Sequence, residues 1–146
     1  MYLASDVMTR NPVTLTELDP LSLAESIFHL GRVRHLPVVR KGKLVGLVTQ
    51  RDLLKAYARR GEARGPTLLA AEAMRTPVFQ VSPQQPAKEV FKAMLRRKFG
   101  CAAVVESGKL IGIITEADGV KFAMRVINEL DRIGTIAGQL TGARRQ

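Results

Sequence analysis

The sequence predicts a mixed α/β fold made of two similar halves that are related by a pseudo-two-fold axis. The first observation is an internal repeat: GLVTQRD at 46–52 returns as GIITEAD at 112–118, at a constant offset of 66 residues. The second is that each copy places short apolar β runs between segments with helical spacing. The third is size, since 146 residues with 46% hydrophobic content suffice for a compact core. We therefore expect two β-α-β-β-α repeats whose small sheets pack together, with the helices outside.

The first half is expected to begin with a lead-in turn at 5–8, which Pro12 converts into extended chain. A short strand at 13–15 and a helix at 20–30 follow, the helix carrying apolar residues at helical spacing. Runs at 35–39 and 44–49, joined by a turn around Gly42, are typical of a β-hairpin. A helix at 50–60 and a polar linker from Gly61 to Pro66 complete this half.

The second half repeats the plan, with a lead-in at 71–74, a helix at 87–98, a hairpin at 102–105 and 110–115, and a helix from 116 to about 130. Beyond 131, the glycines at 134, 138 and 142 disfavour a long helix and predict a frayed basic tail. The predicted divisions are 1–62 for the first repeat with its lead-in, 63–70 for a linker, 71–130 for the second repeat and 131–146 for the tail.

Composition narrows the range of functions. A net charge of +10, from 23 Lys and Arg against 13 Asp and Glu, favours anionic partners such as nucleotides, polyphosphates, nucleic acid or an acidic protein surface. One cysteine, Cys101, and two histidines exclude an internal disulfide and give no basis for a metal site. The sequence has no apolar run of about 20 residues and no visible signal peptide, so we expect a cytoplasmic protein that does not span a membrane.

The repeated segment places a threonine and an aspartate at a strand-to-helix junction in each half: Thr49 with Asp52, and Thr115 with Asp118. The threonine hydroxyl can cap the helix, and the carboxylate one turn further on can accept hydrogen bonds from a hydroxyl-bearing ligand. Helix N-termini also attract phosphate. The alternative is that the pattern marks only a helix start. Two copies in matched context weigh against it and predict two related pockets.

These residues resemble a known family. The markers of the first half are VMTRNPVT at 7–14, RHLPVV at 34–39, GKLVG at 42–46 and TQRD at 49–52, and those of the second half are AMRTPV at 73–78, AAVV at 102–105, GKLIG at 108–112 and TEAD at 115–118. Each half resembles a CBS domain, and the pair, over about 5–127, resembles a Bateman module. The resemblance implies a regulatory protein without catalytic activity or cofactor. It would bind AMP, ADP, ATP or a related adenosine compound between its halves, form a homodimer through its helices, and signal to a regulated protein that the sequence does not identify.

The resemblance also implies roles for individual residues. Asp52 and Asp118 would hold ribose hydroxyls, Thr49 and Thr115 would meet ribose or phosphate, and Arg34 and His35 would reach the phosphates. Apolar residues and backbone of both halves would enclose the adenine. The nucleotide-binding residues predicted in this way are Val13, Arg34, His35, Pro37, Thr49, Arg51, Asp52, Thr76, Val78, Phe99, Gly100, Cys101, Thr115 and Asp118.

The two predicted sites differ in charge. Arg34, His35 and Arg51 accompany the first aspartate, whereas the matching positions of the second half are Gly100, Cys101 and Ala117. The second site is therefore expected to lack local cations. Because arginine suits a phosphate chain, we expect the Asp52 site to bind phosphorylated nucleotides more tightly.

Two other functions compete with this interpretation. The basic surface is compatible with nucleic-acid binding, although no helix-turn-helix, zinc-finger or RNA-binding aromatic motif is present in the sequence. An enzyme is less favoured, because no set of nucleophile, base and acid stands out.

Overall fold

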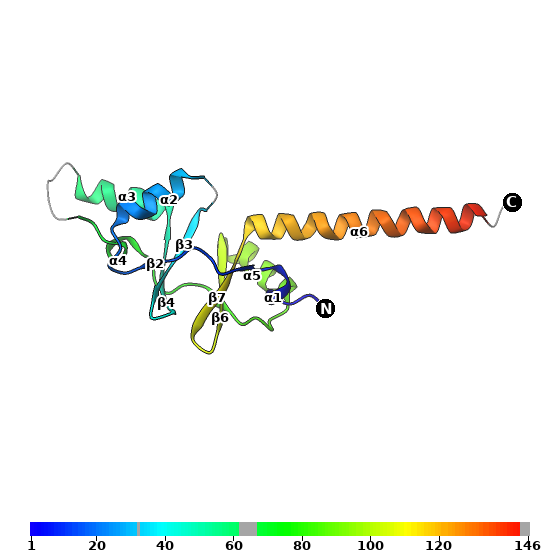
Figure 1. Cartoon of the computed structure of the whole chain (residues 1–146), viewed down its shortest axis with the longest axis horizontal. Coiled ribbons are helices and arrows are strands. Elements are labelled where there is room, and N and C mark those ends of the chain that lie inside the picture. Colours follow the sequence, from blue (N-terminus) through cyan, green and yellow to red (C-terminus); the bar gives the residue numbers. More distant parts are fainter. Residues whose placement is uncertain (32, 62–66, 144–146) are drawn as a thin grey trace.

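The structure is a computed structural model that describes residues 1–31, 33–61 and 67–143 (Figure 1). The first part of the chain contains α1 (Ala4–Val7), β1 (Thr9–Arg10), β2 (Leu15–Thr16), α2 (Leu21–His29), β3 (His35–Arg40), β4 (Lys43–Thr49) and α3 (Gln50–Arg60). The second part contains α4 (Ala70–Ala73), β5 (Gln80–Val81), α5 (Ala87–Arg97), β6 (Cys101–Glu106), β7 (Lys109–Thr115) and α6 (Glu116–Ala143). The mixed α/β class and the repeated order of elements are as the sequence predicts.

Two hairpins form the centre of the fold. β3 pairs antiparallel with β4, and β6 pairs antiparallel with β7, while the short strands β2 and β5 add in parallel to β3 and β6. The hairpin turns contain Gly42 and Gly108, both at φ +78°, a conformation that glycine adopts without steric cost. The strand order β2-β3-β4-β7-β6-β5 joins the halves through the pair Lys43 and Lys109. The hairpins predicted from the sequence are therefore confirmed.

The segments that open the two halves, residues 1–12 and the matching 67–77, are called the lead-ins, and each of them packs against the other half. β1 pairs with β7 of the second half, and α1 packs into the second core, which contains Val90, Val104 and Ile114. In the matching position, Arg75 bridges to Leu47 of β4, and α4 packs into the first core. Each core thus includes the lead-in of the other half, although chain order assigns residues 1–12 to the first.

The length expected for the last helix, α6, is wrong. The helix does not end near 130 but runs for 28 residues to Ala143, and it projects away from the sheet (Figure 1). Each glycine costs about 1 kcal/mol relative to alanine, but apolar residues continue at helical spacing through Leu130, Ile133 and Leu140. The expected end of the basic tail, 144–146, and the stretch 62–66, which includes the first half of the predicted linker 63–70, lie outside the described residues. In the part of the chain that the structure describes, no helix combines the length and apolarity needed to cross a membrane.

Candidate functional site

The repeated strand-to-helix junction that carries the threonine and the aspartate, here called the corner, has the same geometry in both halves. Thr49 is the N-cap residue of α3, and its hydroxyl accepts a hydrogen bond from the backbone N–H of Asp52 at 3.3 Å. The Asp52 carboxylate in turn accepts from the backbone N–H of Thr49 at 2.9 Å and from its hydroxyl at 2.8 Å. Thr115 and Asp118 make the same contacts at 3.4, 2.8 and 3.0 Å. The predicted capping role of the threonines is confirmed, and it uses one oxygen of each carboxylate.

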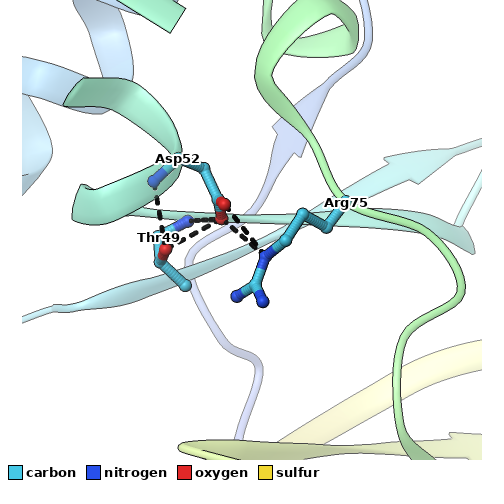
Figure 2. A network of polar contacts seen from close by, with 3 residues as sticks. All are labelled: Thr49, Asp52 and Arg75. Carbon is cyan, nitrogen blue, oxygen red and sulfur yellow. Dashed lines mark hydrogen bonds and ion pairs between the residues drawn. The ribbon is translucent and has the colours of Figure 1, made fainter. Parts of the chain in front are cut away.

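A residue from the crossed lead-in contacts each aspartate. The Nε of Arg75 donates to Asp52 at 2.9 Å from Oδ1 and 3.0 Å from Oδ2 (Figure 2). At the matching position of the first half, 66 residues earlier, the hydroxyl of Thr9 donates to Oδ1 of Asp118 at 2.7 Å. Both aspartates are nearly buried, at 4% and 8% exposure. One corner is therefore closed by an ion pair and the other by a hydrogen bond from an uncharged hydroxyl.

A large cavity lies at the first corner; we call it the Arg75 cavity. Its volume is about 820 Å³. Its cationic lining comes from Arg34, Arg51, Arg75 and Lys98. Nine of the predicted residues line it: Arg34, His35, Thr49, Arg51, Thr76, Val78, Phe99, Gly100 and Cys101. Such a lining suits a ligand that carries negative charge.

A second cavity, the Asp118 cavity, has a volume of about 510 Å³. Of the predicted residues, Arg34, His35, Thr115 and Asp118 line it. Lys121 contributes a cation and Glu116 an acid. Three predicted residues lie elsewhere in the described part of the chain: Val13 and Pro37 line neither cavity, and Asp52 stands behind Arg75 without lining one.

The expectation that the second site lacks local cations is wrong. Arg34 and His35 line both cavities, and Lys121 adds to the second. The reason is spatial: a Cβ on Gly100 would come within 2.7 Å of His35 Nε2, so the matching segments of the two halves lie side by side between the cavities. Alignment of the repeats assigns each residue to its own half and cannot show this sharing.

His35 lies between the two cavities, and its surroundings shift its pKa. Burial lowers its pKa from the ordinary value of 6.5, and the nearby Arg75 and Arg34 lower it further, while Glu116 and Asp52 act in the opposite direction. The imidazole is therefore largely neutral at pH 7 and can both donate and accept hydrogen bonds.

An aromatic surface lies in the Arg75 cavity. The rings of Phe79 and Phe99 stack with centroids 5.1 Å apart and an interplanar angle of 29°. Both residues line the cavity, and Phe99 is 38% exposed, so it does not simply fill the core. A flat apolar group such as a purine base can pack against such a surface.

Several residues that line the cavities or contact the aspartates are not among the predicted ones, and the most important are Thr9, Arg75, Lys98 and Lys121. The repeat offset links Thr9 with Arg75, which marks the two as equivalent positions. Nothing in the sequence indicates that either would contact the aspartate of the other half.

The chain belongs to the CBS domain family, which matches it at residues 4–59 and 70–125. This confirms the resemblance drawn from the repeated motifs and identifies the chain as a tandem CBS module. Over 116 residues it is 33% identical to an inosine-5'-monophosphate dehydrogenase of Korarchaeum cryptofilum, a match that covers 79% of this chain and 23% of the relative. The chain spans less than half the length of the first curated relatives it matches, between 23% and 45%.

Solved structures give the same assignment. The crystal structure of AcuB from Vibrio cholerae has a TM-score of 0.82 at 37% identity, covering 90% of this chain and 97% of that chain. The crystal structure of CBSX2 in complex with AMP has a TM-score of 0.75 at 25% identity, covering 86% of this chain and 98% of that chain.

Proposed function

We propose that this tandem CBS module is a regulatory protein that binds an adenosine nucleotide, such as AMP, ADP or ATP, between its two repeats. The observation that carries the proposal is the Arg75 cavity, which combines cationic side chains with the stacked Phe79 and Phe99. The similarity to CBSX2, whose structure contains AMP, supports the ligand class. The occupied and empty states would then differ in affinity for a regulated protein in the cytoplasm, without catalysis or a cofactor.

The proposed roles follow from where the groups lie. The phosphate oxygens contact Arg34, Arg51 and Arg75, because guanidinium groups form charge-assisted hydrogen bonds with phosphate. Arg75 releases Asp52 to make this contact. The adenine packs near Phe99, and the ribose hydroxyls donate to an aspartate. The Asp118 cavity has fewer cations and an additional acid, so the Asp52 corner remains our proposed site for phosphorylated nucleotides.

The test is calorimetric titration of AMP, ADP and ATP into the unmodified protein and into Asp52→Ala and Asp118→Ala. We expect Asp52→Ala to weaken AMP binding by about 10- to 100-fold, because hydrogen bonds to a charged group contribute about 1.5–3 kcal/mol. Asp118→Ala should weaken it less. Asp131→Ala, an exposed acid on α6, is the matched control and should leave affinity unchanged.

Two results would contradict the proposal. Equal loss from both aspartate variants would contradict the preference for the Asp52 corner. In a thermal-shift assay, a nucleotide present at about 100 times its Kd should add about 2.7 kcal/mol to the free energy of unfolding. If no nucleotide raises the melting temperature, nucleotide binding itself is contradicted. Salt-sensitive binding to duplex DNA in the same assay would favour the nucleic-acid alternative.

We also propose that the protein forms a homodimer in which a second copy of the chain packs against α6. From Ile127 to Ala143 every residue of this helix is exposed, and the apolar positions Val126, Leu130, Ile133, Ala137 and Leu140 follow the spacing of a coiled-coil seam. A glycine-containing helix of this length needs packing to be stable. Beyond 126 the described charges are Glu129, Asp131 and Arg132, which is unlike the basic face of a membrane-surface helix.

We therefore expect Leu130→Asp combined with Ile133→Asp to convert a dimer into a monomer, since two buried charges per helix are costly. Light scattering coupled to size-exclusion chromatography measures the mass. Asn128→Asp, a change on the polar face, should remain dimeric. A monomeric unmodified protein, or a dimer that survives the double substitution, would reject the α6 interface.

A further inference from the structure

We propose that Arg75 makes the Asp52 corner selective for phosphorylated nucleotides over the corresponding nucleosides, a proposal that rests on the proposed function. The position of Arg75 is fixed by its backbone. Its N–H donates to the carbonyl of Leu47 at 2.9 Å, and its carbonyl accepts from the N–H of Leu47 at 3.1 Å. The crossed lead-in therefore holds the residue at the corner while leaving its side chain free to turn.

Most of the hydrogen-bonding capacity of the Asp52 carboxylate is already used. Oδ2 accepts the backbone N–H and the hydroxyl of Thr49, and the Arg75 Nε lies 3.0 Å from Oδ2 and 2.9 Å from Oδ1. A carboxylate offers about four lone-pair positions, and these contacts occupy most of them. Asp52 is only 4% exposed and does not line the cavity. A ribose hydroxyl can reach this carboxylate only after the guanidinium has moved away.

The Arg75 side chain can make that movement. It is 62% exposed in the ion pair and already lines the cavity, so turning it inward disturbs no packed core. A ligand with a phosphate offers the freed guanidinium a new anionic partner, which offsets the lost ion pair. A nucleoside offers only its hydroxyls and leaves the guanidinium without an anion. The same arginine thus opposes one ligand and favours the other.

The other half of the molecule provides an internal comparison. Thr9 contacts Asp118 through a neutral hydroxyl at 2.7 Å, and Asp118 lines its cavity. A hydroxyl both donates and accepts, so a ribose hydroxyl can replace it or share the carboxylate without separating an ion pair. We therefore expect the Asp118 corner to bind nucleosides and nucleotides with smaller discrimination.

The experiment exchanges the two residues. Arg75→Thr is made in an Asp118→Ala background, so that only the Asp52 corner is read, and Thr9→Arg is made in an Asp52→Ala background. Calorimetry at constant ionic strength gives Kd for AMP and for adenosine. Arg75→Thr should reduce the ratio of the adenosine Kd to the AMP Kd by about tenfold or more, as adenosine binds more tightly and AMP more weakly. Thr9→Arg should raise that ratio at the other corner, and Arg75→Lys should retain part of the discrimination.

The outcomes separate this proposal from the one on which it rests. If AMP binds but Arg75→Thr changes both affinities by the same factor, the selectivity proposal is overturned while nucleotide binding stands. If neither ligand binds any variant although circular dichroism shows them folded, both proposals are overturned. Adenosine binding that appears only in Arg75→Thr supports the selectivity role directly.

Discussion

Gly46→Ala is expected to lower the free energy of unfolding by about 1–3 kcal/mol, because added volume in a packed core forces side chains out of their preferred positions. Gly46 is buried in β4, and a Cβ there would lie 2.5 Å from the sulfur, 2.9 Å from Cγ and 3.0 Å from Cβ of Met74. The far end of a methionine can move, but its Cβ is fixed by the backbone. Urea denaturation followed by circular dichroism measures the loss.

Gly138→Ala is the matched control. Apart from the neighbouring backbone of α6 itself, no atom of the described residues lies within 4 Å of a Cβ at this position. Alanine in place of glycine in a helix should raise stability by up to about 1 kcal/mol. The same substitution is thus expected to have opposite signs at the two sites. Equal midpoints for Gly46→Ala and the unmodified protein would show that β4 and Met74 do not approach this closely.

The Cys101 thiol is expected to react about 100-fold more slowly in the folded protein than in urea at pH 8. Burial raises the pKa of this thiol from 9.0 to about 11, with a smaller opposing effect from Arg75. Only the thiolate attacks a disulfide reagent, so the reactive fraction falls by about two orders of magnitude. Spectrophotometric titration of the thiol with an aromatic disulfide measures both rates.

The same shift predicts how stability depends on pH. The folded state holds the Cys101 proton more tightly than the unfolded state, so its contribution to stability is present below pH 9 and is lost as pH rises toward 11. Cys101→Ser removes the titration and is the control for this interval. A folded-state labelling rate close to the rate in urea would mean that the thiol is not buried as described.

Much of the fold could be predicted from the sequence because the same pattern of elements occurs in both halves of the internal repeat. The hairpins, α3 and the capping threonines carry strong local signals: β-branched runs, turn glycines and a hydroxyl before a helix. The crossing of the lead-ins carries none, since it consists of β1, which has two residues and no periodicity, and of a single bridge between Arg75 and Leu47. The length of α6 is not predicted, because glycines at 134, 138 and 142 favour an early helix end although the apolar spacing continues past Leu130.

The charge of the site was harder to predict than its shape. The Thr-Asp corners followed from the repeat, but the cations around them come from segments distant in the chain, such as Arg75 and Lys98. Arg34 and His35 lie between the two cavities and belong to both. Such sharing depends on how the halves dock, which a comparison of one half with the other cannot reveal.

The crossed lead-ins mean that neither repeat is a self-sufficient folding unit. A fragment cut at the linker would leave each piece without the short helix that packs on its interior, so the cores that contain Val48 and Ile114 would be partly exposed to water. Anything that loosens one half must therefore loosen the other. That mutual dependence gives an event at a single pocket a direct mechanical route to the whole molecule.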